Sequence, residues 1–145
     1  MFVYESNCEL KFFTVHTIFV DESDGDLKFS TVNKMCVYEL HGDLMYSIVH
    51  ILSVEESNGD LMLCTVHKMF VDKFHGNLKF STEQKTSVDE LHGDLTCSTK
   101  HKIFVAESHA DLKFFTSHTL SVDESNGDLK FSTVQKYFLT NHTVT

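Results

Sequence analysis

Phe19-Val-Asp-Glu-Ser-Asp-Gly-Asp-Leu-Lys-Phe-Ser-Thr-Val-Asn-Lys-Met35 is one copy of a seventeen-residue unit that recurs along the chain without insertion or deletion. Short repeats in constant phase indicate units that cannot bury their own apolar face and must pack against their neighbours. The sequence therefore predicts a single repeat domain over residues 1–145, with eight copies at about 2–137 and a truncated copy at 138–145. A valine and a leucine recur in all eight full copies: Val3, Val20, Val37, Val54, Val71, Val88, Val105 and Val122, and Leu10, Leu27, Leu44, Leu61, Leu78, Leu95, Leu112 and Leu129.

The glycines mark the turn of each unit. All six occupy one position of the repeat, at Gly25, Gly42, Gly59, Gly76, Gly93 and Gly127. Asp24-Gly25 is typical of a two-residue type I′ hairpin, whose central residues take positive φ. Such a hairpin places Val20 opposite Phe29 as a cross-strand pair. Outside the turn, apolar and polar residues alternate with the period of a β-strand, and this parity places Val32 on the outward face.

These patterns predict an all-β protein in which the tandem repeats form an antiparallel hairpin or meander sheet, arranged as a barrel, a sandwich or a propeller-like fold. Whether each repeat holds one long strand or two short ones stays open. The truncated ninth copy either pairs with the first strand to close the sheet or ends frayed. The alternative is a β-solenoid with one coil per repeat. It ranks second because it would stack carboxylates such as Asp26 and Asp43 about 4.8 Å apart, where like charges repel by roughly 1 kcal/mol.

Composition limits the classes of function. The chain has 145 residues, with a hydrophobic fraction of 41% and a charged fraction of 23%, which is typical of a globular protein. Its net charge is −9, and it has no arginine. Nucleic acid and anionic membrane are not expected as partners, because binding phosphate needs clustered basic residues. The start of the sequence does not resemble a signal peptide, and no apolar run approaches the roughly 20 residues of a membrane helix. A cytoplasmic location is the default expectation.

The ten histidines are the only candidates for chemistry. Weak candidates for a zinc, copper or nickel site are His50, His67, His101 and His118, which share one position of the unit. The simpler interpretation is a polar position where His, Gln and Asn replace one another. His41, His75, His92 and His109 precede the turn glycine or its replacement and are interpreted as turn residues. The four cysteines fall at four different positions of the unit, which predicts free thiols.

No catalytic motif is present, no cofactor is expected, and near-identical units do not bring unlike residues together as an active site requires. The sequence favours a non-enzymatic structural, scaffold or self-associating protein, with the chain itself as partner. Phe19, Phe70 and Phe104 are expected to lie exposed on the face opposite the core and to support sheet stacking. Two alternatives stay open: a translated tandem-repeat reading frame without evolved activity, and a repeat-display binding module that is lectin-like or weakly metal-binding.

Overall fold

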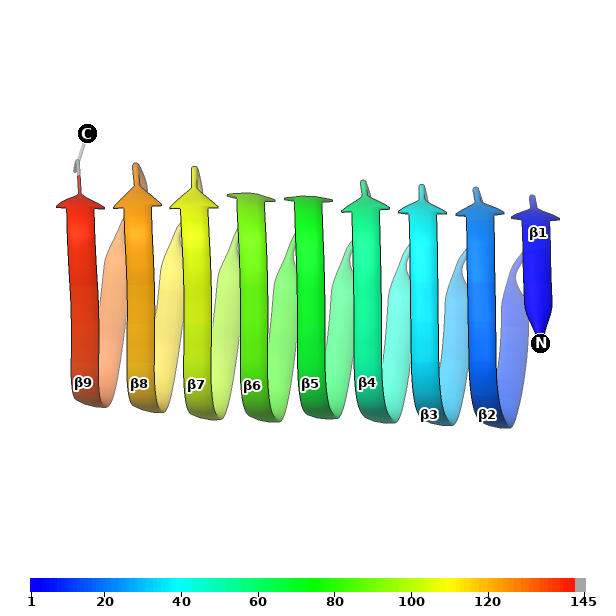
Figure 1. Ribbon diagram of the computed structural model, residues 1–145, viewed down its shortest axis with the longest axis horizontal. Coiled ribbons are helices and arrows are strands. Elements are labelled where there is room, and N and C mark those ends of the chain that lie inside the picture. Colours follow the sequence, from blue (N-terminus) through cyan, green and yellow to red (C-terminus); the bar gives the residue numbers. More distant parts are fainter. Residues whose placement is uncertain (143–145) are drawn as a thin grey trace.

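The chain forms a parallel β-solenoid in which each repeat makes one coil (Figure 1). The structure is a computed structural model; it describes residues 1–142, without the side chains of Lys100, Asn141 and His142. The predicted antiparallel meander is wrong, and the alternative of a solenoid with one coil per repeat is confirmed. The described residues hold nine strands: β1 Phe2–Ser6, β2 Leu10–Ser23, β3 Leu27–Leu40, β4 Leu44–Ser57, β5 Leu61–His75, β6 Leu78–His92, β7 Leu95–Ser108, β8 Leu112–Ser125 and β9 Leu129–His142.

The strands pair in sequence order, from β1 at one edge to β9 at the other. Each residue pairs with its equivalent one repeat later, so that Leu27 lies beside Leu44 and Val20 beside Val37. The predicted pair of Val20 with Phe29 does not form, because the chain advances by one coil at each turn instead of reversing. The described residues of the truncated copy, 138–142, pair with β8 and not with the first strand. Its last three residues, 143–145, lie outside the described part.

Each long strand bends around the core, and the bends explain which residues point inward. On β3 the buried residues are Leu27, Phe29, Val32, Met35, Val37 and Leu40. Their spacing of two or three positions departs from strict alternation. The expectation that Val32 points outward is wrong, because two consecutive residues turn outward on either side of it, at 30–31 and at 33–34. Each bend therefore shifts by one residue the alternation between side chains that face the core and side chains that face outward.

The core lies between the early and the late half of each coil. Phe131 on the early half of β9 packs against Tyr137 on its late half, with ring centroids 6.1 Å apart. The Tyr46 hydroxyl donates a hydrogen bond across the core to the Met35 sulfur, and burial raises the pKa of Tyr46 well above its usual value. Burying one such large side chain stabilises the fold by roughly 1.5–3 kcal/mol. Stacking coils therefore supplies the core that one unit cannot make alone.

The glycine position is fixed by stacking between coils and not by a hairpin turn. A Cβ atom added to Gly59 would lie 2.1 Å from the carbonyl oxygen of Gly42 in the preceding coil. Within the described residues only Gly93 has a positive φ, of 146°, so the predicted type I′ turn is wrong. The turn backbones are close enough for coil-to-coil hydrogen bonds to continue through them, as from the Asp24 amide to the Ser6 carbonyl at 2.8 Å.

The aspartate row beside this glycine explains why the like-charge argument against the solenoid failed. The Asp43 backbone amide donates to Asp26 Oδ1 at 3.1 Å, and the Asp60 amide donates to Asp43 Oδ1 at 2.9 Å. Asn77 continues the row, since its Oδ1 accepts from the Asp94 amide at 3.2 Å. Each side-chain oxygen thus binds the next coil, and charge-assisted hydrogen bonds of this kind offset the repulsion between carboxylates.

Candidate functional site

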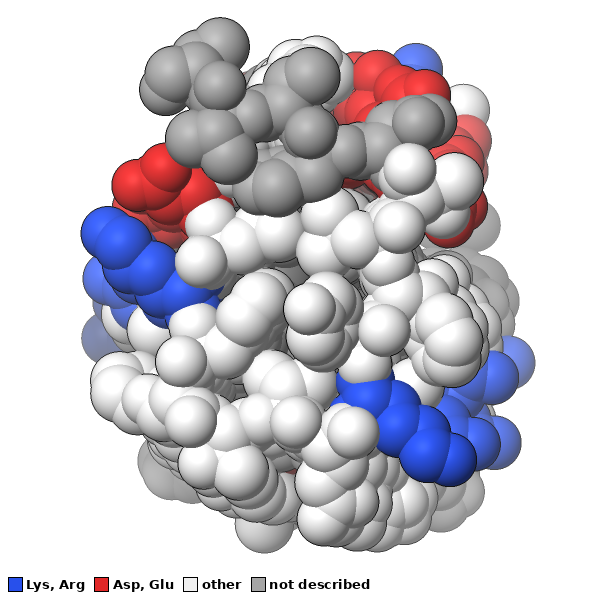
Figure 2. All heavy atoms as spheres, turned by 90° about the vertical axis from the view of Figure 1, so that its left-hand side faces the viewer, with Lys and Arg blue, Asp and Glu red and all other residues white. Residues whose placement is uncertain are grey.

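Charged side chains form separate bands along the solenoid. Figure 2 shows the Asp and Glu side chains gathered mainly at the turn end of the cross-section, with Lys side chains farther round on both sides. On one side Lys28 pairs with Glu9, and Lys113 Nζ lies 3.7 Å from Asp94 Oδ2. Because every coil repeats the same outward positions, a charge that recurs in the unit becomes a row along the whole surface.

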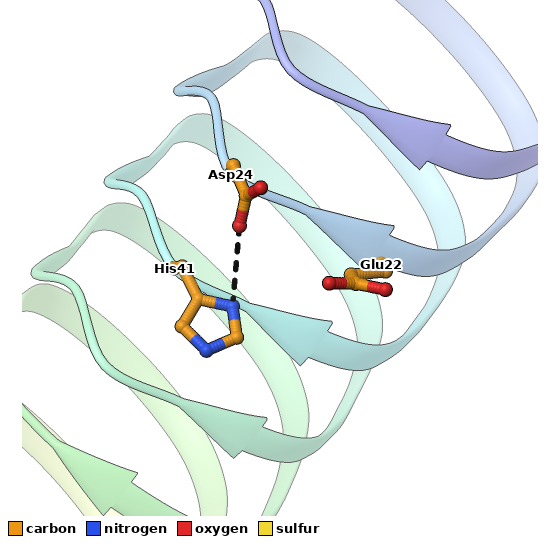
Figure 3. Close-up of side chains that lie close together, drawn as sticks. All are labelled: Glu22, Asp24 and His41. Atoms are coloured by element: carbon orange, nitrogen blue, oxygen red, sulfur yellow. Dashed lines mark ion pairs between the residues drawn. The ribbon is translucent and has the colours of Figure 1, made fainter.

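One group at the turn end combines three side chains that bind metals in other proteins. Glu22 and Asp24 lie on one coil and His41 on the next, and one ligand atom of each lies within 4.8 Å of the others. Figure 3 shows His41 Nδ1 directed at Asp24 Oδ1, 3.5 Å away. The other ring nitrogen, Nε2, lies 3.4 Å from Glu39 Oε1. All three residues of the group are exposed, and the arrangement is that of a surface ion-pair network.

Sequence reasoning placed Asp24 and His41 at turns but did not bring them together with each other or with Glu22. The missing information was the coil-to-coil register, which sets position 24 of one coil beside position 41 of the next. Within the described residues, Glu22, Asp24 and His41 are the one set of three such ligands that converge.

The four predicted metal candidates do lie beside one another in two pairs. The rings of His50 and His67 are 5.5 Å apart and meet edge to face, while those of His101 and His118 stack in parallel at 4.9 Å. The lone pairs of an imidazole lie in the plane of its ring, so parallel stacked rings do not aim them at a common ion. His118 Nδ1 instead shares a 2.7 Å hydrogen bond with Gln135 Oε1 on the next coil.

The turn histidines form a second stack. His92 lies between His75 and His109, with centroid distances of 4.7 and 4.8 Å. His92 Nε2 is 2.7 Å from Glu90 Oε1, and this hydrogen bond holds the pKa of the Glu90 carboxyl below its usual value. The stack thus joins neighbouring turns by ring contacts, while the hydrogen bond of His92 with Glu90 stays within one coil.

The late halves of the strands form a flat face, which is the side of the arrows turned toward the viewer in Figure 1. On β5 its outward residues are Lys68, Phe70 and Asp72, which alternate with the buried Met69 and Val71. Phe19, Phe70 and Phe104 are 36%, 43% and 42% exposed, as the sequence predicted. Two shallow hollows of about 480 and 410 Å³ run between the phenylalanine positions and the acidic positions, and they share Ser53 and Glu55.

These features define the chain as a regular parallel β-solenoid with ladders of like residues on its surface. Comparisons with protein-family models, with curated proteins and with solved structures give no match to the chain. Within residues 1–142 there is no helix of the length and apolar character needed to cross a membrane. All four cysteines lie in this part and are unbonded.

Proposed function

We propose that the protein is a non-enzymatic structural element, a rigid β-solenoid that associates with further copies of itself. The observation that carries this proposal is the exposure of Phe19, Phe70 and Phe104 in line on a flat sheet face. Large apolar side chains aligned on an open sheet favour stacking against another sheet. The coils beneath them are held by ladders of backbone hydrogen bonds and by buried Val and Leu rows, so the face is presented without internal rearrangement.

The uniformity of the coils supports a structural role over catalysis. Neighbouring coils present similar residue types at most positions, whereas an active site brings several unlike functional groups together at one place. The converging group of Glu22, Asp24 and His41 is exposed, and within it His41 pairs with Asp24 along the surface. A surface that repeats from coil to coil is suited to bind a second copy, whose surface repeats in the same way.

Light scattering coupled to size-exclusion chromatography tests the proposal, with far-UV circular dichroism on the same fractions. We expect β-type spectra and a mass above the 16.6 kDa of one chain, increasing with protein concentration. A β-rich monomer at every concentration would contradict self-association. A spectrum without β-structure would contradict the fold itself.

A further inference from the structure

The flat face carries three parallel rows of outward side chains along the solenoid. A phenylalanine row occupies the centre: Phe2 and Phe19 stack on neighbouring coils, and Phe70, Phe104 and Phe138 follow with small residues between them. A lysine row runs along one side: Lys34, Lys68, Lys85, Lys102 and Lys136. An acidic row runs along the other: Asp21, Glu55, Asp72, Asp89 and Asp123. We propose that this face binds the same face of a second copy, with the lysine row of each copy set against the acidic row of the other.

This inference rests on the proposed self-association and names the surface that produces it. All ten charged side chains of the two rows are exposed, and none takes part in an ion pair among the described residues. By contrast, lysines on the other side of the solenoid, such as Lys28 and Lys113, have carboxylate partners within their own chain. The charges of both rows are therefore not engaged in ion pairs within the described part of the chain and can pair with a partner.

The arrangement of the rows determines how two copies can meet. Because the lysine and acidic rows flank the phenylalanine row on opposite sides, rotating one copy about the solenoid axis exchanges their places. Two faces brought together in this way, with their axes parallel, set lysine against carboxylate on both flanks. Rotation about an axis along the strands would set each row against its own kind, which like-charge repulsion disfavours. Charge thus selects the parallel arrangement.

The order of residues within the rows fixes the offset between the copies. From β3 to β9 the lysine row and its gaps are Lys34, Ile51, Lys68, Lys85, Lys102, Thr119 and Lys136. From β2 to β8 the acidic row and its gaps are Asp21, Tyr38, Glu55, Asp72, Asp89, Ala106 and Asp123. Both rows have the same order along the solenoid: one charged residue, one uncharged, three charged, one uncharged and one charged. On one flank, a shift of one coil therefore pairs every lysine of one copy with a carboxylate of the other, and every uncharged residue with an uncharged one. On the opposite flank the same shift pairs three of the five lysines, Lys34 with Glu55, Lys68 with Asp89 and Lys102 with Asp123.

Without that shift, each flank has only two pairs, Lys68 with Asp72 and Lys85 with Asp89. Both rows repeat at the coil spacing of about 4.8 Å, so a match at one coil persists along the whole face. A basic peptide from another protein would have to supply this spacing by chance, whereas a second copy has it by construction.

The same shift fits the central row. It sets Phe70 of one copy against Ser53 of the second copy, and Phe104 against Ser87 of the second copy. Large side chains then face small ones, as in the interdigitated side chains between stacked β-sheets, except at the first coils, where Phe19 of one copy faces Phe2 of the second copy. With no shift each phenylalanine would face its own equivalent. Two independent patterns, charge on the flanks and size in the centre, thus favour one offset.

The size of the face predicts the strength of binding. Eight coils at about 4.8 Å and four residues at about 3.3 Å give a face of roughly 38 by 13 Å, or about 500 Å² on each copy. The pair would bury about 1,000 Å² in total, which is the lower limit for a specific interface. Association is therefore expected to be weak, and salt should weaken it further because the charged rows lie at the solvent-exposed edges.

Sedimentation velocity on charge-reversed variants tests the proposal. In one variant the central lysines are reversed by Lys68→Glu, Lys85→Glu and Lys102→Glu. In the other, the central acids are reversed by Glu55→Lys, Asp72→Lys and Asp89→Lys. Each variant alone should associate at least about tenfold more weakly than the natural chain, because like charges then face each other. An equimolar mixture of the two variants should recover the association, since both flanks are again complementary.

The matched control is the variant Lys79→Glu, Lys113→Glu and Lys130→Glu. It has the same net charge as the lysine-reversed variant, but its changes lie on the early half of the coils, away from the flat face. It should associate within about twofold of the natural chain, and circular dichroism confirms that each variant is folded. An equal loss in this control, or a mixture that stays monomeric, would overturn the proposed face.

The outcomes also separate this inference from the proposed function. If the natural chain and both reversed variants associate alike, the protein self-associates through another surface and the face is wrong. If the natural chain is monomeric at low salt and at every concentration, the face and the proposed self-association are both wrong.

Discussion

Asp43 and Asp60 are joined by a 2.9 Å hydrogen bond in which the backbone amide of Asp60 donates to the carboxylate of Asp43, one coil earlier. The same contact recurs at several turns, so a row of like charges becomes a ladder of coil-to-coil bonds. This relationship explains how so acidic a chain can stack its repeats in register.

The variant Asp43→Ala should lower the free energy of unfolding by about 1 kcal/mol, because it removes the acceptor of the Asp60 amide. Asp43→Asn is the matched control, since Asn77 already accepts a bond of this kind from the Asp94 amide at 3.2 Å. The asparagine variant should retain the stability of the natural chain. Urea unfolding measures both, and equal losses in the two variants would show that the hydrogen bond is not the cause.

Adding one methyl group at the turn should disturb the stacking of coils. Gly59→Ala places a Cβ 2.1 Å from the Gly42 carbonyl oxygen, and overpacking of this kind costs about 1–3 kcal/mol. Ala110 occupies the equivalent position in another coil, so Ala110→Gly should change stability much less. Thermal unfolding compares the two variants, and an unchanged midpoint for Gly59→Ala would contradict the close approach of the turn backbones.

Val66 and His67 are neighbours in sequence but lie on opposite sides of the sheet. Val66 is 1% exposed, whereas His67 is exposed. Val66→Ala should therefore lower stability by about 1–3 kcal/mol, through lost burial and the cavity left behind. His67→Ala should have an effect within about 0.5 kcal/mol, as for most surface substitutions. Equal effects would mean that the strands do not bend as described.

The pair of Lys28 and Glu9 should be visible in a titration. The hydrogen bond from Lys28 holds the pKa of the Glu9 carboxyl below its usual value. Because the folded pKa is lowered, the contribution of Glu9 to stability is present above its unfolded pKa of about 4.3 and is lost as pH falls through the folded value. Lys28→Met should raise the pKa of Glu9, as followed by NMR of the carboxyl carbon. Lys79→Met, far along the solenoid, should leave it unchanged.

Much of the local structure could be predicted from sequence, because it depends on residues close together in the chain. The repeat length, the strand character and the inward positions of Val20 and Leu27 all follow from the periodicity. The exposure of Phe19 also follows from it. The position of Val32 did not, because two bends within one strand reset the alternation of faces.

The direction of pairing could not be read from the same pattern, since an antiparallel and a parallel sheet need the same alternation. The choice depended on a contact between residues seventeen positions apart, in which the Asp26 carboxylate accepts the Asp43 amide. The group of Glu22, Asp24 and His41 was missed for the same reason. His50 and His67, by contrast, become neighbours in either topology.

Disulfide mapping tests the parallel register most directly. Ser47 and Cys64 lie between the paired positions Tyr46 with Leu63 and Ile48 with Thr65, so their Cα atoms should be about 4.8 Å apart, within the range for a disulfide. In an antiparallel hairpin turning at Gly59, Cys64 would instead face Ser53. Under mild oxidation, Ser47→Cys should form a disulfide with Cys64, identified by mass spectrometry of peptides, and Ser53→Cys should not. A disulfide between Cys64 and the cysteine introduced at position 53, with none to position 47, would contradict the solenoid.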